Sequence, residues 1–123
     1  MLGNFYHPIN MPTPIDIVVY LHTRGGCRVE GMFLKNVLLP RIGLVLFDFA
    51  GSGYSSGEYI TLGYDEALDA IRVIKYVKSL VKVNKVIVWG RSMGAVAAIL
   101  AASKSKEENL IHCLILDSPF SCF

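Results

Sequence analysis

The stretch that most constrains the fold is Lys85–Ala102, which holds the five residues Gly90-Arg91-Ser92-Met93-Gly94. The apolar run Val86–Trp89 precedes the first glycine, and the alanine-rich run Ala95–Ala102 follows the second. This order predicts a strand, a sharp turn and a helix. Such a turn exposes a serine hydroxyl at the end of a sheet, beside helix N–H groups that favour a developing oxyanion. We therefore predict that Ser92 is a nucleophile.

The two glycines flank the serine because side chains at these positions would crowd the strand and the helix. Gly90 and Gly94 are accordingly predicted to be the glycines of a nucleophile elbow. A Gly-x-Ser-x-Gly string also arises by chance. The predicted strand before it and helix after it supply the structural context that the motif requires.

Apolar strand patterns alternate with helical patterns along the rest of the chain. The expected strands cover 15–21, 42–47, 86–89 and 110–116, and the expected helices follow a stripe at Val29, Met32, Phe33 and Val37, then 62–81 and 95–102. This alternation predicts an α/β fold: a mostly parallel sheet of about four strands with helices on both faces, in three layers. We expect a single domain, with an irregular lead-in over residues 1–14 and a core over 15–123.

Polar residues follow each of the predicted strands. His22, Asp48, Ser92 and Asp117 all fall where a strand ends. Ligands of such sheets bind beyond the carboxyl ends of the strands. We therefore expect these four residues to lie along one edge of the sheet.

Four pieces of the chain, in this order, resemble the α/β-hydrolase superfamily, and within it serine hydrolases of the serine aminopeptidase-like or acyl-thioesterase-like kind. They are the strand ending in His22, the loop Asp48–Ser55, the elbow Gly90–Gly94 and the strand ending in Leu116–Phe120. The resemblance implies a nucleophilic Ser92, with the backbone N–H of Met93 as one oxyanion donor. It also implies that His22 shapes the oxyanion loop and that the N–H of Thr23 or Arg24 is the second donor.

The sequence departs from the family in two places. The family usually has His-Gly where this chain has His22-Thr23, and a β-branched residue turns its N–H toward an oxyanion less readily than glycine does. The family also places its catalytic acid and histidine after two further strands. The resemblance therefore covers the N-terminal, nucleophile-bearing part of the fold, and we expect a truncated α/β-hydrolase.

The chain offers few candidates for a general base. Its three histidines are His7 in the lead-in, His22 in the oxyanion loop and His112 in the opening half of the last strand. We expect His7 to be exposed and inert and His112 to be a structural residue, which leaves His22 as the alternative base. Asp117 is the candidate acid, with a structural cap on the following turn as the alternative, and Asp48 is expected to fix its loop.

The remaining composition excludes several classes of function. Cys27, Cys113 and Cys122 show no metal-type pairing, so we expect reduced thiols, no metal and no cofactor. A net charge of +2 without a cluster of arginines argues against nucleic acid as a partner. No apolar run reaches the ~18 residues that a transmembrane helix needs, and no signal peptide is visible. We expect a cytoplasmic protein that acts on a small-molecule or acyl substrate; the oligomeric state stays open.

Two interpretations of function follow. In the first, the chain is part of a serine hydrolase that cleaves an ester, thioester or amide through an acyl-serine intermediate. In the alternative, it is a non-catalytic binding module or a truncated gene product on a degenerate hydrolase fold. A downstream reading frame with a further strand, an aspartate and a late histidine would favour the first.

Overall fold

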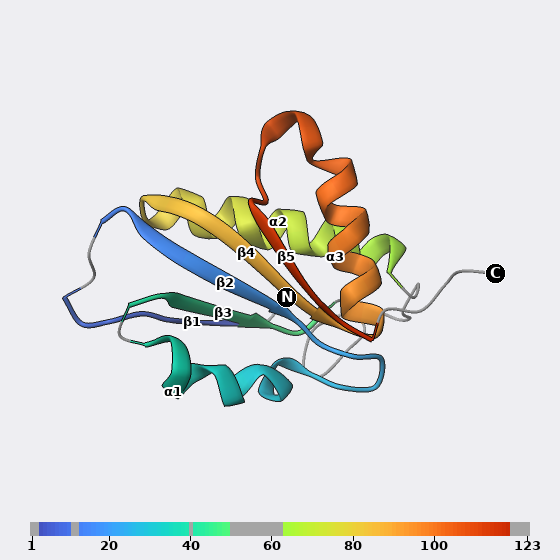
Figure 1. Ribbon diagram of the computed structural model, residues 1–123, viewed down its shortest axis with the longest axis horizontal. Helices are drawn as coiled ribbons and strands as arrows, with labels where there is room; N and C mark the ends of the chain where they lie inside the picture. The colour runs from blue at the N-terminus through green and yellow to red at the C-terminus, as the bar shows by residue number, and fades with distance from the viewer. Residues whose placement is uncertain (1–2, 11–12, 40, 50–62, 119–123) are drawn as a thin grey trace.

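The computed structural model describes residues 3–10, 13–39, 41–49 and 63–118 (Figure 1). Its strands are β1 (Gly3–Tyr6), β2 (Ile15–Leu21), β3 (Gly43–Phe47), β4 (Val83–Arg91) and β5 (Cys113–Asp117). Its α-helices are α1 (Lys35–Leu38), α2 (Tyr64–Leu80) and α3 (Met93–Lys104), and its 3₁₀ helices are η1 (Arg28–Leu34) and η2 (Lys106–Glu108).

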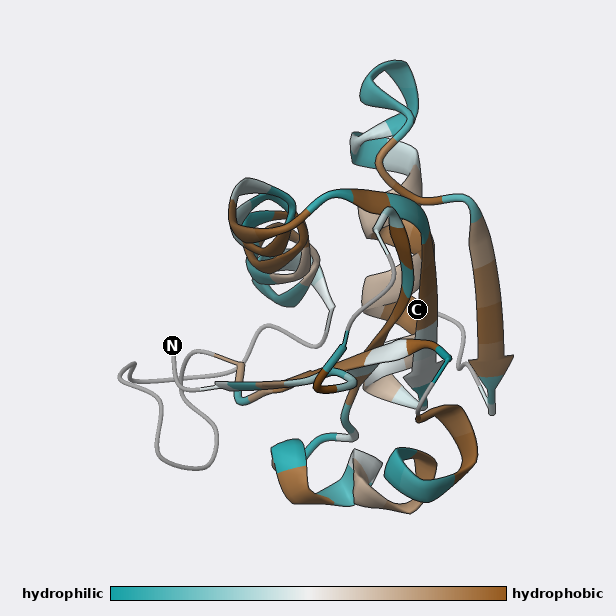
Figure 2. Ribbon diagram, turned by 90° about the vertical axis from the view of Figure 1, so that its left-hand side faces the viewer, coloured by the Kyte–Doolittle hydropathy of each residue, from teal (hydrophilic) through white to brown (hydrophobic). Residues whose placement is uncertain are grey.

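The strands form one sheet in the order β1-β3-β2-β4-β5. β1 pairs with β3 in the antiparallel sense, and the other neighbours are parallel. Helices α2 and α3 cover one face of the sheet, and η1 with α1 covers the other (Figures 1 and 2). The predicted three-layer α/β fold with a mostly parallel sheet is confirmed.

Strand β1 corrects the expectation of an irregular lead-in over residues 1–14. It pairs with β3 from Gly3 opposite Phe47 to Tyr6 opposite Leu44, and it is the fifth strand where about four were expected. A strand of four residues beside three prolines carries almost no periodic signal of its own. Its formation depends on the unpaired edge of β3, which the local sequence does not reveal.

Strands β2 and β3 are buried on both faces of the sheet. Ile17, Val19 and Leu21 of β2 contribute to the core under α2 and α3, whereas Val18 and Tyr20 contribute to the core under η1. Double-sided burial explains why these strands appear in the sequence as continuous apolar runs rather than alternating ones.

The segment formed by η1 and α1 does not bury the face that was predicted. The stripe formed by Val29, Met32, Phe33 and Val37 is exposed, with Val37 75% and Val29 63% accessible. Instead, Gly31 and Leu34 are buried against the sheet. The first turns are 3₁₀, whose three-residue period places these two residues on one side. A Cβ on Gly31 would lie 2.8 Å from Tyr20 Cδ1, so glycine allows the helix to approach the strand closely.

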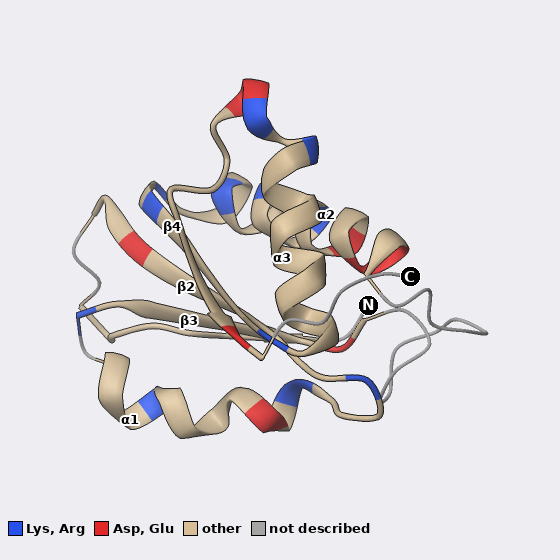
Figure 3. Ribbon diagram, turned by 45° about the vertical axis from the view of Figure 1, so that its right-hand side comes forward, with Lys and Arg blue, Asp and Glu red and all other residues tan. Residues whose placement is uncertain are grey.

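Helix α2 buries two acidic side chains near its N-terminus. Glu66 accepts a hydrogen bond from the Gly63 N–H at 2.6 Å, which caps the helix. Asp69 is only 4% exposed and pairs with Arg72 at 3.2 Å. Figure 3 shows acidic and basic residues interspersed along the described helices and strand ends rather than gathered by sign.

Strand β5 lies at the edge of the sheet and begins later than predicted. It covers Cys113–Asp117 and pairs only with β4, so most of its residues are exposed rather than buried. His112 precedes it and is exposed. None of the helices in the described ranges has the length and apolar character required to cross a bilayer.

The packing of α2 on the sheet generates a stability prediction. Ile74 is fully buried, whereas Leu80 on the same helix is 56% exposed. Ile74→Ala should lower the free energy of unfolding by about 2–5 kcal/mol because it leaves a cavity. The matched change Leu80→Ala should alter it by less than about 0.5 kcal/mol. Urea denaturation measures both, and equal losses would contradict the packing described.

Candidate active site

Ser92 occupies the turn between β4 and α3 in a strained backbone conformation. It is half-buried, and its φ of 53° and ψ of −113° lie outside the regions that a non-glycine residue normally adopts. The Ser92 N–H donates to the Asp117 carbonyl at 2.8 Å, which ties the turn to the end of β5. Such strain persists only where the surrounding structure enforces it, and it is commonest at functional sites.

The two elbow glycines are required by backbone packing. A Cβ on Gly94 would lie 2.0 Å from the Leu21 carbonyl oxygen, and one on Gly90 would lie 2.2 Å from the Gly94 carbonyl oxygen. Neither contact can be relieved by a side-chain rotation because both atoms belong to the backbone. The glycines therefore let α3 begin directly against the end of β2.

The N-terminus of α3 lies immediately after the serine. The Ser92 carbonyl accepts hydrogen bonds from the N–H groups of Ala95 at 3.0 Å and Val96 at 3.2 Å. The Met93 N–H comes before these first helical bonds, where the helix dipole is positive. This position is the one predicted for an oxyanion donor.

His22 is fully buried at the end of β2, and both of its ring nitrogens are engaged. Nε2 accepts from the Phe49 N–H at 3.3 Å, so Nδ1 carries the proton and donates to the Thr23 carbonyl at 2.7 Å. The ring also packs on Phe49 with centroids 4.7 Å apart. His22 therefore holds the loop after β2 and has no nitrogen left to take a proton from Ser92.

The other two histidines lie at the amino ends of the parallel strands, whereas Ser92 lies at their carboxyl ends. His112 Nδ1 accepts from the Val86 N–H at 3.0 Å, near the beginning of β4. His7 follows β1, whose last residue pairs with Leu44 at the beginning of β3, and His7 Nδ1 lies 3.0 Å from the Pro8 carbonyl. Ser92 follows the end of β4, so none of the three histidines is placed to activate it.

Asp48 is buried and fixes the chain beneath it. Its carboxylate accepts from the Arg28 backbone N–H at 2.7 Å and forms an ion pair with the Arg28 guanidinium at 2.5 Å. The aspartate thus ties the end of β3 to the beginning of η1. Of the resembling loop after Asp48, residues 50–55 lie outside the described residues, as do Pro119 and Phe120 of the last matched piece.

Asp117 lies at the carboxyl edge, next to the elbow, with 53% of its side chain exposed. The carboxylate is 3.6 Å from Arg91 Nε and accepts from the Ser118 hydroxyl at 3.0 Å. These contacts match the structural alternative, a cap on the following turn. No histidine of the chain contacts Asp117 in the part of the structure that is described.

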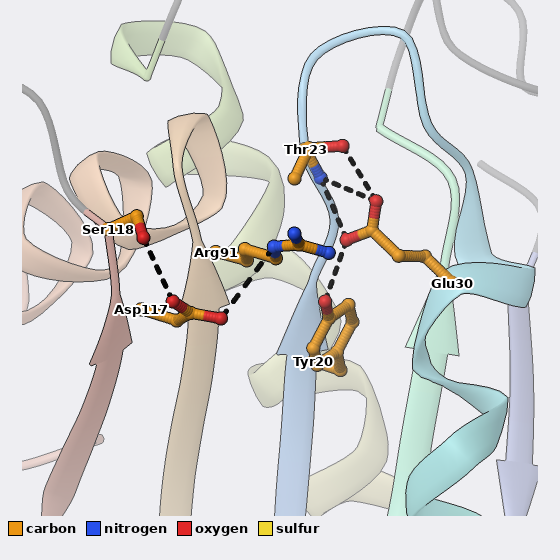
Figure 4. A network of polar contacts seen from close by, with 6 residues as sticks. All are labelled: Tyr20, Thr23, Glu30, Arg91, Asp117 and Ser118. Atoms are coloured by element: carbon orange, nitrogen blue, oxygen red, sulfur yellow. Dashed lines mark hydrogen bonds and ion pairs between the residues drawn. The ribbon is translucent and has the colours of Figure 1, made fainter.

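The structure corrects one predicted donor. The Thr23 N–H, expected to face an oxyanion, instead donates to Glu30 Oε2 at 3.1 Å, and the Thr23 hydroxyl donates to Glu30 Oε1 at 2.6 Å (Figure 4). Tyr20 donates its hydroxyl to the same carboxylate at 2.7 Å. Burial and the neighbouring Glu30 carboxylate raise the pKa of Tyr20 well above its ordinary value.

Sequence reasoning missed Glu30 and Tyr20. A lone acidic residue among Val29, Gly31 and Met32, and a tyrosine one residue before the end of a strand, have no characteristic spacing. Only the fold brings them together with the loop after His22.

The described residues contain no group of three His, Cys, Asp or Glu side chains arranged to hold a metal ion. Cys27 and Cys113 are free thiols, and Cys122 lies outside the described residues.

Comparison with known proteins places this geometry in context. A family model described as the alpha/beta hydrolase fold matches residues 16–122. The chain is 35% identical over 111 residues to a lysophosphatidylserine lipase, ABHD12, of Gallus gallus, and 36% identical over 111 residues to that of Mus musculus. The matches cover 85% of this chain but only 28% and 27% of the relatives, so the chain spans little more than a quarter of their length.

Solved esterase structures share the fold. The esterase Pf2001 of Pyrococcus furiosus superposes with a TM-score of 0.75 at 32% identity, covering 85% of this chain and 42% of that one. Est1E of Butyrivibrio proteoclasticus, determined with ferulic acid bound, gives a TM-score of 0.78 at 25% identity, covering 96% and 48%.

The contact between the elbow and β2 generates a prediction. Gly94→Ala forces a Cβ into the Leu21 carbonyl, so it should lower the free energy of unfolding by more than about 4 kcal/mol or prevent folding. Gly25→Ala is the control: Gly25 has φ of 79° but open space around its Cβ. It should cost only about 1–2 kcal/mol for the left-handed backbone. Urea denaturation compares them, and a Gly94→Ala variant as stable as Gly25→Ala would refute the contact.

The raised pKa of Tyr20 generates a second prediction. The folded state holds the phenol proton more tightly than the unfolded state, so this contribution to stability is present below the ordinary tyrosine pKa of about 10 and is lost as pH rises above it. Tyr20→Phe should lower the free energy of unfolding by about 1.5–3 kcal/mol at pH 7, the range for hydrogen bonds to charged groups. It should also weaken the decline above pH 10. Denaturation at several pH values measures this, and parallel declines in both proteins would count against it.

Proposed function

Since this chain belongs to the α/β-hydrolase family, we propose that it carries the nucleophile of a serine hydrolase that forms an acyl-Ser92 intermediate. The observation that carries the proposal is the backbone of Ser92. A non-glycine residue at φ 53° lies between two glycines whose positions leave no room for a Cβ, at the beginning of a helix. This arrangement presents a hydroxyl at the carboxyl edge of the sheet and aligns helix N–H groups with a developing oxyanion.

The proposed substrate is a carboxylic ester with an acyl chain. The similar proteins bear the names of a lysophosphatidylserine lipase and of esterases, and the chain shares about a third of its residues with two of them. Thioester and amide cleavage follow the same acyl-serine chemistry. No contact within the described ranges favours them, and the aminopeptidase-like resemblance therefore remains the less supported alternative.

In the proposed reaction, Ser92 Oγ attacks the acyl carbonyl carbon while a general base removes the hydroxyl proton. The carbonyl oxygen gains negative charge and accepts from the Met93 N–H and from a second donor in the loop after β2. The alcohol then leaves with that proton, and water releases the acid in a second step. We propose that the base is none of the three histidines of this chain. Both ring nitrogens of His22 are bonded, and the other two histidines lie at the amino ends of the parallel strands, away from Ser92.

The placement of the three histidines, none of which can activate Ser92, favours a second candidate, a non-catalytic module on the hydrolase fold. A serine without a base is a weak nucleophile, although an oxyanion hole and substrate binding alone can leave a rate about 10³–10⁴-fold above water. The two candidates differ in whether the natural protein reacts with a serine-directed probe.

The natural gene product should react covalently with a fluorophosphonate probe at Ser92, because the probe requires an activated serine and an oxyanion hole. Ser92→Ala should abolish labelling. Ser103→Ala, which changes an exposed serine on the same helix, should label as the natural protein does. Peptide mapping by mass spectrometry locates the adduct. A folded natural protein that does not label, or that labels elsewhere, would support the non-catalytic module instead.

A further inference from the structure

We infer that Glu30 is a positioning residue that holds the loop Thr23–Gly26 in the conformation required for the second oxyanion donor. This inference rests on the proposed function. Glu30 belongs to η1 on the face of the sheet opposite α3, and it acts through the loop rather than by touching substrate.

The Glu30 carboxylate binds three donors from two segments. Oε1 accepts from the Thr23 hydroxyl at 2.6 Å, and Oε2 accepts from the Thr23 N–H at 3.1 Å and the Tyr20 hydroxyl at 2.7 Å. Tyr20 lies near the end of β2 and is 2% exposed, so its hydroxyl anchors the carboxylate to the core. Hydrogen bonds to an ionised acceptor are about twice as strong as neutral ones. The Glu30 carboxylate therefore fixes the loop at its first residue, Thr23.

The rest of the loop is a tight turn that this carboxylate supports. The Gly26 N–H donates to the Thr23 carbonyl at 3.0 Å, and Gly25 has φ of +79°, the positive value that a type II turn requires at its third residue. A Cβ on Gly26 would lie 2.7 Å from Glu30 Oε1, so the carboxylate occupies the space beneath the turn.

The orientation of one peptide plane follows from these bonds. The Thr23 carbonyl accepts from Gly26 N–H and from His22 Nδ1–H. In a trans peptide the next N–H points away from this carbonyl, so the Arg24 N–H is directed away from both donors. No acceptor among the described residues takes the Arg24 N–H, and Thr23 N–H is already bonded to Glu30. The unbonded Arg24 N–H is the donor assigned to the oxyanion, and Glu30 holds the residue before it, Thr23, through the Thr23 N–H and hydroxyl.

A positive charge at the end of the neighbouring strand β4 lies near the Tyr20–Glu30 pair. Figure 4 shows the Arg91 guanidinium between Asp117 and the Tyr20–Glu30 pair, and its charge acts on Tyr20 in the direction opposite to that of Glu30. Arg91 directly precedes Ser92. Arg91 thus places a positive charge beside the Tyr20 hydroxyl that binds Glu30, on the strand that carries the nucleophile.

The test compares Glu30→Ala and Glu30→Gln with the control Glu107→Gln, an exposed glutamate on η2, in the natural gene product. Steady-state kinetics with p-nitrophenyl butyrate give kcat and KM, and hydrogen exchange reports on the Thr23 amide. Glu30→Ala should lower kcat by about 10–100-fold, the scale of a donor misplaced by about 1 Å, with KM within about threefold. Its Thr23 amide should exchange at least about tenfold faster because the N–H loses its carboxylate. Glu30→Gln, which retains one acceptor oxygen, should recover part of both.

A merely structural role makes a different pattern. Ile74→Ala lowers stability far from the loop, so at a temperature where it is folded it should retain kcat. If Glu30→Ala also retains kcat within about twofold, or if its Thr23 amide stays protected, the inference is overturned while Ser92 labelling keeps the proposed function. If the natural protein shows neither turnover nor labelling, the proposed function fails. The inference rests on that function and is then overturned with it, whatever the exchange rate of the Thr23 amide.

Discussion

The structure around the candidate site depends on one contact, the approach of the α3 backbone to the end of β2. The Cβ that any residue other than glycine would place at Gly94 overlaps the Leu21 carbonyl. Because α3 begins this close to the sheet, the chain must reverse within Ser92, and the serine adopts its positive φ. The reactive geometry proposed for Ser92 is therefore a consequence of helix–sheet packing, held by cores on both faces of the sheet.

Separate local contacts hold the neighbouring strand ends. A buried histidine follows β2 and holds its loop, and a buried aspartate paired with Arg28 follows β3. The carbonyl of Asp117 at the end of β5 accepts the Ser92 N–H. Each of these groups has a structural partner. What the described residues provide is a rigid frame for a nucleophile and for the oxyanion donors, whereas proton transfer requires a group that the three histidines do not supply.

Sequence patterns predicted the elbow and the sheet because these depend on local features. The apolar run before Gly90, the helix after Gly94 and the alternation of elements are all visible within short windows. Strand β1 was not predicted because its pairing with β3 is a long-range contact. The exposure of Val29, Met32 and Phe33 was not predicted because this segment has a 3₁₀ period in place of the α-helical one. The partner of the Thr23 N–H was missed because Glu30 reaches it across a turn, a contact that no spacing rule encodes.

The proposed function requires that Ser92 carry the acyl group during turnover. Rapid-quench mass spectrometry of the natural protein with an acyl ester detects this intermediate. Before the steady state, the mass of one acyl group should appear on the peptide that contains Ser92, and it should decay as the acid is released. Ester turnover with no adduct on that peptide, or with the acyl group on another residue, would contradict it.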